Sequence, residues 1–172
     1  MKRLLKKRTV ILSEEKLKFI NDWALLAAEH FKDHKHIRTK EQRIDNIIIG
    51  KIAEEVVYEI FSPIYNVTSV SYIINEDGKG DGGIDLWIAG KSWDIKCVNQ
   101  DFKTERPVAQ SVSDYYAFVR VNKESTGGTY IGALNKEGLF KFAKERNNEG
   151  VNYKYVLDYV FEKNVNFDDI EF

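Results

Sequence analysis

Two carboxylates and one ammonium group alternate with apolar residues in a short segment of this sequence. Asp85, Asp94 and Lys96 lie within residues 83–97, a pattern typical of two β-strands joined by a turn at Gly90–Lys91. With that turn, Asp85 faces Lys96, and all three side chains project from one face of the hairpin. Carboxylates beside a lysine can bind a divalent cation and stabilise charge on a phosphate, so we expect chemistry at this hairpin.

The remaining residues of the hairpin divide between its two faces. The face opposite the charges is apolar and predicts a core face: Ile84, Leu86, Ile88, Trp93, Ile95 and Cys97. Trp87 shares the charged face, which argues against an ordinary solvated surface. A solvated face that carries charges of both signs is the competing interpretation of the same pattern.

A third carboxylate precedes the hairpin on an expected helix. Gly50 lies inside this helix, where glycine costs about 1 kcal/mol relative to alanine, and a close approach to the sheet or a ligand is the usual reason. Gly50, Ala53 and Glu54 share one edge of the apolar stripe. Glu55 is expected in solvent, paired with Lys51. The helical wheel does not separate the two glutamates, so the Gly50 edge is the reason to favour Glu54.

The periodicity of apolar residues defines the elements that position these groups. It predicts helices at about Ser13–Phe31, Thr39–Phe61 and Lys136–Arg146, with Thr39 to Gln42 as a capping box and Pro63 as a stop. Strands are expected at Val67–Asn75, Gly83–Ala89, Ser92–Asn99, Tyr115–Asn122, Thr129–Leu134 and Tyr153–Phe161, and a short helix at Pro107–Ser111. This order predicts an α+β fold with a mixed, mostly antiparallel β-sheet flanked by helices.

The composition is that of an ordinary folded protein, with 43% hydrophobic and 31% charged residues. The 172 residues fit one domain, with a helical and basic extension at 1–38 and a catalytic core at 39–172. A single cysteine cannot form an internal disulfide, which favours a reducing, cytoplasmic compartment. No apolar run is long enough to suggest a membrane span. The net charge of −1 permits nucleic-acid binding without indicating it.

These motifs resemble the PD-(D/E)XK nuclease superfamily. The resemblance consists of Gly50 to Glu54 on a helix, then Ile84-Asp85, then Asp94-Ile95-Lys96 after a gap of eight residues. It covers about residues 45–100. Isoleucine stands where the family name has proline, and only about fifteen residues separate the third and fourth strands, where such folds usually have a full helix. The resemblance implies a restriction-endonuclease-like core.

The resemblance also implies roles for individual residues. Asp85, Asp94 and the backbone carbonyl of Ile95 would bind Mg²⁺, for which Mn²⁺ could substitute. Glu54 would bind the metal or orient a metal-bound water. Lys96 would position the attacking water and offset charge on the phosphate. The implied function is Mg²⁺-dependent endonucleolytic hydrolysis of DNA, whether of a restriction, phage or mobile-element, or junction-resolving type.

Several other polar residues are expected to contact DNA. Lys35, Arg38, Lys40 and Arg43 could contact the DNA backbone, although ordinary surface explains them as well. By resemblance, Gln110 could lie near the active site. A homodimer is possible, because cutting a duplex requires two sites. The alternative function is a non-catalytic, nuclease-like module that binds nucleic acid or a protein, and a third possibility is a structural protein with a charged hairpin.

Overall fold

The computed structural model describes residues 8–30, 39–74, 84–99, 105–108, 112–142, 144–148 and 151–157. Along the chain, the elements are β1 (Arg8–Ile11), α1 (Glu14–His30), α2 (Lys40–Phe61), β2 (Leu86–Ile88), β3 (Lys91–Asn99), β4 (Glu105–Val108), β5 (Tyr115–Val121), β6 (Gly127–Asn135), α3 (Lys136–Phe142), β7 (Lys144–Asn148) and β8 (Val151–Leu157). Helices and strands are both well represented, and the predicted α+β class is confirmed.

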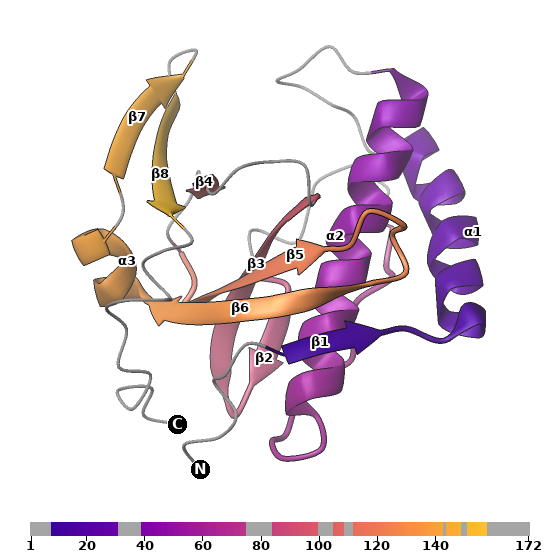
Figure 1. The fold of residues 1–172 in the computed structure, drawn as a ribbon, viewed down its shortest axis with the longest axis horizontal. Helices are drawn as coiled ribbons and strands as arrows, with labels where there is room; N and C mark the ends of the chain where they lie inside the picture. The colour runs from indigo at the N-terminus through magenta and orange to yellow at the C-terminus, as the bar shows by residue number, and fades with distance from the viewer. Residues whose placement is uncertain are drawn as a thin grey trace.

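The larger sheet has five strands in the order β1-β6-β5-β3-β2. Its central strands β3 and β5 are parallel, and the other neighbouring pairs are antiparallel, so the sheet is mixed as expected. A second, antiparallel sheet has the order β4-β8-β7. Figure 1 shows the β7–β8 arm at the upper left, away from the side-by-side helices α1 and α2.

The long helix α2 begins and ends where the sequence predicts. The hydroxyl of Thr39 accepts a hydrogen bond from the Gln42 backbone N–H, and the Gln42 side chain accepts one from Thr39 N–H. This capping box satisfies two N–H groups that a helix N-terminus otherwise leaves unpaired. The helix ends at Phe61, just before Pro63, which has no backbone N–H to donate.

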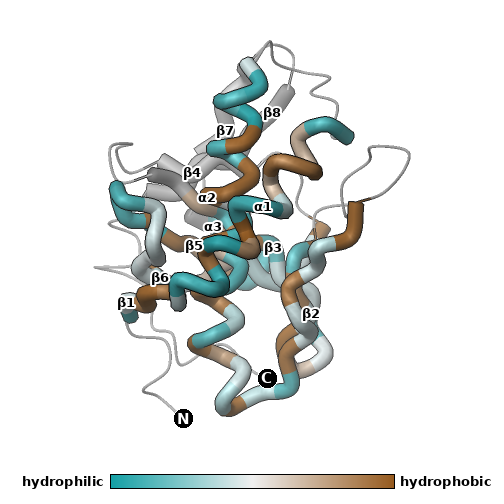
Figure 2. The backbone as a smooth tube through the Cα atoms, turned by 90° about the vertical axis from the view of Figure 1, so that its right-hand side faces the viewer, coloured by the Kyte–Doolittle hydropathy of each residue, from teal (hydrophilic) through white to brown (hydrophobic). Residues whose placement is uncertain are grey.

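The main core lies between α2 and one face of the five-stranded sheet. Ile52, Val56 and Ile60 of α2 are fully buried, as are Leu86 and Trp93 of the hairpin, and all belong to one cluster. Brown apolar stretches alternate with teal polar stretches along the two helices in Figure 2, as expected for helices with one buried face. The hairpin is therefore anchored to α2 by its apolar face.

Some expected elements differ in the structure. Where one helix was expected at 136–146, the shorter helix α3 and the strand β7 are found. Pro107 and Val108, expected to begin a short helix, lie in β4, and residues 109–111 lie outside the described residues. Pro107 is accommodated because β4 is an edge strand, where a missing backbone N–H costs little. The expected strand at 67–75 is reduced, in its described part, to a single bridge between Val67 and Ile88. The short strand β1 was not predicted, because four residues give too little periodicity.

Candidate active site

The β2–β3 hairpin turns one position earlier than predicted. Ala89 and Gly90 occupy the turn with φ values of 50° and 78°, as in a type I′ turn. Leu86 consequently pairs with Trp93, and Ile88 pairs with Lys91. The predicted register is wrong by two residues. Because side chains alternate with a period of two, this shift leaves every residue on its predicted face.

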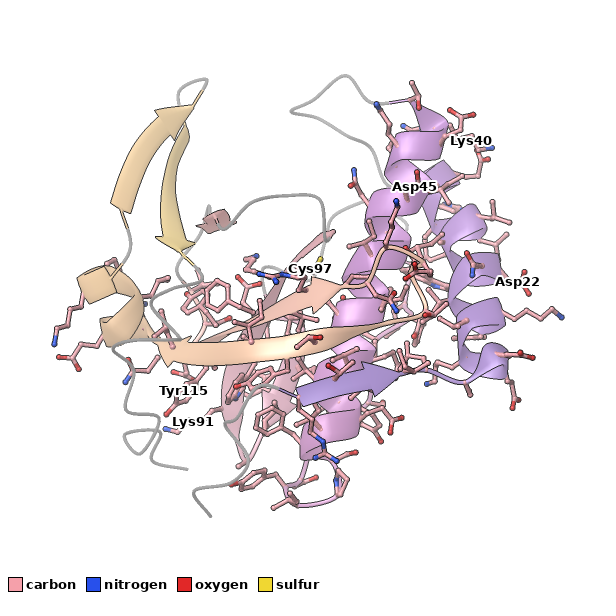
Figure 3. All side chains as sticks on the ribbon, viewed as in Figure 1. Asp22, Lys40, Asp45, Lys91, Cys97 and Tyr115 are labelled. Carbon is pink, nitrogen blue, oxygen red and sulfur yellow. The ribbon has the colours of Figure 1, made fainter. Side chains whose placement is uncertain are left out.

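The two faces of the hairpin have different environments. Leu86, Ile88 and Trp93 are fully buried, and Ile95 is 8% exposed, so these members of the predicted core face are confirmed. On the opposite face, Asp94 is only 3% exposed. Figure 3 shows Lys91 and Tyr115 together near one end of β3 and Cys97 toward the other end. The charged residues thus lie on a strand whose other face is anchored in the core.

Asp94 and Lys96 form an ion pair on this charged face. The Lys96 Nζ lies 2.7 Å from Asp94 Oδ1, and the two side chains are 29% and 5% exposed. They are neighbours because residues i and i+2 of a strand project from the same face. The predicted position of Lys96 opposite Asp85 is replaced by this contact along β3. The partly buried pair holds an ammonium group at a fixed place beside a carboxylate.

Asp85 is held against the edge of β3 that faces β2. Its Oδ2 accepts a hydrogen bond of 2.6 Å from the Ile95 backbone N–H, and its own N–H donates to the Trp93 carbonyl at 2.8 Å. The N–H and C=O of one strand residue point to the same side of the strand. The Asp85 carboxylate and the Ile95 carbonyl therefore lie along the same edge of β3, and Ile95 stands between Asp94 and Lys96 in the sequence of that strand.

We define the hairpin site as Asp85, Asp94, Ile95 and Lys96. The fourth predicted catalytic residue, Glu54, lies on α2 and pairs with Lys51 of the same helix. It is 7% exposed, and its Oε2 lies 2.6 Å from the Nζ of Lys51. The same ammonium lies 5.4 Å from the ring centre of Trp23 and 5.7 Å from that of Tyr72. Lys51, expected to pair with Glu55, is instead the partner of Glu54.

The prediction that Glu55 is in solvent is wrong. Glu55 is 1% exposed, and its Oε1 accepts hydrogen bonds from Lys16 Nζ at 2.9 Å and from the Tyr72 hydroxyl at 2.7 Å. Burial, reinforced by the hydrogen bond to Glu55, raises the pKa of Tyr72 well above its usual range. A signal for this contact was present, because Lys16 lies one turn before Ile20 on the buried stripe of α1.

Gly50 does not mark a close approach of α2 to the sheet. A Cβ atom at this position would meet nothing within 4 Å, so the expected close approach to the sheet is wrong, and an approach to a ligand stays a prediction. Nothing in the structure explains this glycine.

We define the helix cluster as Lys16, Lys51, Glu54, Glu55 and Tyr72, which joins α1, α2 and the segment after α2.

The donor set of the hairpin site fits Mg²⁺. Among the described residues, no group of three His, Cys, Asp or Glu side chains is placed to hold a metal ion. Mg²⁺ does not require such a cage, because proteins usually hold it with one or two carboxylates and leave other positions to water and substrate phosphates. Asp85 and the Ile95 carbonyl supply hard oxygen atoms at the edge of β3, and Asp94 supplies further oxygen atoms from the charged face of the same strand.

The residues expected to contact DNA are only partly described. Lys35, Arg38 and Gln110 lie outside the described residues. Lys40 forms a surface ion pair with Glu29, so part of its charge is already compensated. The hydrogen bond and the charge of Lys40 lower the pKa of Glu29, and the positive charge of Arg43 adds a smaller contribution. In the described part of the chain, no helix is long and apolar enough to cross a membrane.

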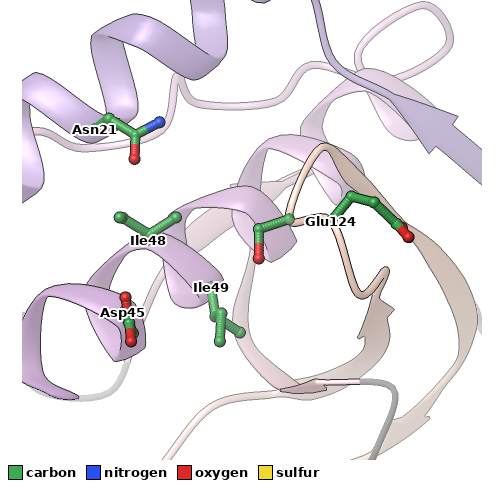
Figure 4. A pocket seen from close by; sticks show the side chains of 6 residues that line it. Asn21, Asp45, Ile48, Ile49 and Glu124 are labelled. Carbon is green, nitrogen blue, oxygen red and sulfur yellow. The ribbon is translucent and has the colours of Figure 1, made fainter. Parts of the chain in front are cut away.

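A cavity of about 410 Å³ lies away from the hairpin site, between α1, α2 and the β5–β6 turn. Figure 4 shows Asn21 on α1 across from Ile48, with Asp45 and Ile49 further along α2. Asp45 and Glu124 both line this cavity. Two carboxylates repel an anionic backbone, so the cavity is not suited to hold the phosphates of a nucleic acid.

Comparison with protein-family models and with curated protein sequences found no match to this chain.

Proposed function

We propose that the protein is a Mg²⁺-dependent endonuclease that hydrolyses DNA phosphodiester bonds at the hairpin site. One observation carries this proposal: the Asp85 carboxylate is fixed on the Ile95 amide, next to the Asp94–Lys96 ion pair. Two carboxylates, a carbonyl and an ammonium group are thereby gathered on adjacent strands. The resemblance to the PD-(D/E)XK superfamily supports the same assignment.

The residues of the hairpin site have different roles in the proposed reaction. Asp85, Asp94 and the Ile95 carbonyl would hold Mg²⁺, which supplies a more acidic water and positive charge near the phosphate. Lys96 offsets the negative charge that develops on the phosphate, and its contact with Asp94 keeps the ammonium in place. A preorganised ammonium needs little rearrangement during the reaction, which is why it stabilises the transition state effectively.

Glu54 has a smaller part in this proposal. Its carboxylate contacts Lys51 on its own helix. It contributes to catalysis only if it exchanges this contact for a metal-bound water. The nuclease function therefore depends on the hairpin site, and Glu54 is assigned to it by resemblance.

The alternative function is a non-catalytic, nuclease-like module that binds nucleic acid or a protein. The observation that favours it is the internal pairing of the acidic residues, since Asp94 contacts Lys96, Glu54 contacts Lys51 and Asp85 accepts the Ile95 N–H. Carboxylates satisfied by their own chain can serve stability alone.

Cleavage assays separate the two functions. Plasmid DNA and short DNA and RNA strands are incubated with the protein in Mg²⁺, Mn²⁺ or EDTA. The nuclease proposal expects DNA cleavage with either metal, none in EDTA, and none with Asp94→Asn. Binding without cleavage under all metal conditions would support the non-catalytic module. Cleavage that persists in Asp94→Asn would show that the activity arises elsewhere.

A further inference from the structure

Trp87 is an exposed aromatic residue beside the hairpin site. It lies in the middle of β2, and its side chain projects from the same face as those of Asp94 and Lys96. Trp87 is 46% exposed, whereas Trp23 is 8% exposed and Trp93 is fully buried. The fold buries only part of this large ring, so the rest of its apolar surface remains available to a ligand.

The backbone of Trp87 is held on both sides. Its N–H donates to the Thr68 hydroxyl at 2.9 Å, and its carbonyl accepts the Thr68 N–H at 2.9 Å. Across the hairpin it pairs with Ser92. A ring mounted on a fixed backbone loses little conformational entropy when a ligand packs against it. Trp87 is therefore prepared to contact a ligand without rearrangement of the strand.

The neighbours of this ring indicate what kind of ligand it contacts. Ser92 lies directly opposite and Asp94 lies diagonally across the hairpin, while Asp85 stands two residues before Trp87 with its carboxylate at the edge of β3. These neighbours are polar or acidic, whereas the centre of a protein-binding surface is apolar and poor in charge. A nucleobase suits these surroundings, because it offers one flat face for stacking and carries a phosphate that Lys96 can attract.

We propose that Trp87 is a stacking platform for an unpaired base next to the phosphate bound at the hairpin site. This inference rests on the proposed function and specifies its substrate class as single-stranded DNA or DNA with unpaired bases. Two residues of a strand span about 6.7 Å, short enough for one nucleotide to reach both Trp87 and Asp85. A base inside a duplex is covered by its neighbours on both faces and cannot stack on the ring.

Intrinsic fluorescence measures this contact without cleavage. The full chain is titrated in EDTA with a single-stranded thymidine oligonucleotide, and separately with a blunt duplex of equal length. The single strand is expected to quench the emission of the wild type, because Trp87 is the exposed tryptophan. The duplex should quench it far less. Trp87→Phe, which keeps an aromatic ring at this position, should lose the quenching.

Affinities measured by fluorescence anisotropy of a labelled oligonucleotide complete the test. Trp87→Ala should bind the single strand about tenfold or more weakly, in keeping with the loss of one base–aromatic stack. Phe19→Ala is the matched control, because Phe19 is 50% exposed and lies on α1, which packs against α2. Its affinity should equal that of the wild type.

The outcomes distinguish the proposed base stacking on Trp87 from the proposed nuclease activity. Unchanged wild-type emission, or equal single-strand affinity in Trp87→Ala and wild type, overturns the platform even if the protein cuts DNA. Quenching that is lost in Trp87→Phe, with weak binding by Trp87→Ala, supports the platform even if no metal produces cleavage. In that second case the nuclease proposal fails and base binding remains.

Discussion

The helix cluster and the hairpin site both combine lysines with carboxylates, but they contain different numbers of each. The helix cluster contains two lysines and two glutamates, each lysine is paired with a glutamate, and Tyr72 adds a further hydrogen bond. The hairpin site contains two aspartates and one lysine, beside a half-exposed tryptophan. A balanced, buried cluster can stabilise the fold without any ligand. The two aspartates of the hairpin site supply the oxygen atoms that an added cation such as Mg²⁺ prefers.

The largest expected effect is on catalysis at the hairpin site. Lys96→Ala should lower the rate of DNA cleavage about 10²–10³-fold, because removal of one fixed charge stabiliser typically has this effect. DNA binding should remain measurable. Single-turnover cleavage assays give the rate, and Lys91→Ala at the exposed start of β3 is the matched control. Wild-type rates in Lys96→Ala would remove this residue from the proposed mechanism.

The next effect is on the stability conferred by the helix cluster. Glu55→Gln should lower the free energy of unfolding by about 2 kcal/mol, because it breaks an ion pair whose carboxylate is almost fully buried while Lys16 remains 35% exposed. Urea unfolding measures the change. Glu59→Gln, at an exposed position of the same helix, should change stability by less than about 0.5 kcal/mol. Equal effects of both substitutions would show that the cluster contributes no special stability.

A smaller effect is expected when Mg²⁺ binds. At ten times its dissociation constant, Mg²⁺ should stabilise the wild type by about 1.4 kcal/mol through mass action. Asp85→Asn keeps an oxygen that can accept the Ile95 N–H but removes a negative charge, so its melting temperature should rise much less with Mg²⁺. Thermal melts with and without Mg²⁺ give the comparison, and Asp45→Asn is the control on α2. Equal shifts in wild type and Asp85→Asn would exclude Asp85 as a ligand.

The smallest effect concerns the helix that carries Glu54. Gly50→Ala should raise the free energy of unfolding by about 0.5–1 kcal/mol, because alanine favours the helix and its Cβ meets nothing within 4 Å. Urea unfolding checks the sign, and cleavage activity should not change. Destabilisation would mean that Gly50 is required for a contact after all, which would revive the close-approach explanation.

The sequence predicted the long elements well because their signals are local. The capping box at Thr39 and the stop before Pro63 fixed α2 to within a residue. The alternation at 92–99 identified β3, which begins one residue earlier, and placed Asp94 and Lys96 on one face. These patterns depend on neighbouring residues only, so a single sequence contains them.

The turn of the hairpin and the position of Glu55 depended on tertiary contacts. A glycine suits the first position of a type II′ turn, which favoured Gly90–Lys91. The structure instead places Ala89 at positive φ, where its N–H donates to the Asn66 carbonyl. Glu55 is buried because Lys16 and Tyr72, distant in sequence, meet it. A helical wheel contains no information about such partners.

The pairing of β1 with β6 has a consequence for the synthesis of the chain. Arg8 pairs with Tyr130 and Ile11 with Gly127, and a Cβ on Gly127 would collide with the Val10 carbonyl. On the ribosome β1 emerges before β6, and the elements from α1 to β5 are synthesised between them. Until then β1 lacks this neighbour, and an unpaired strand can capture another chain. The pairing of β1 with β6 therefore forms late, and folding depends on contacts that are remote in sequence.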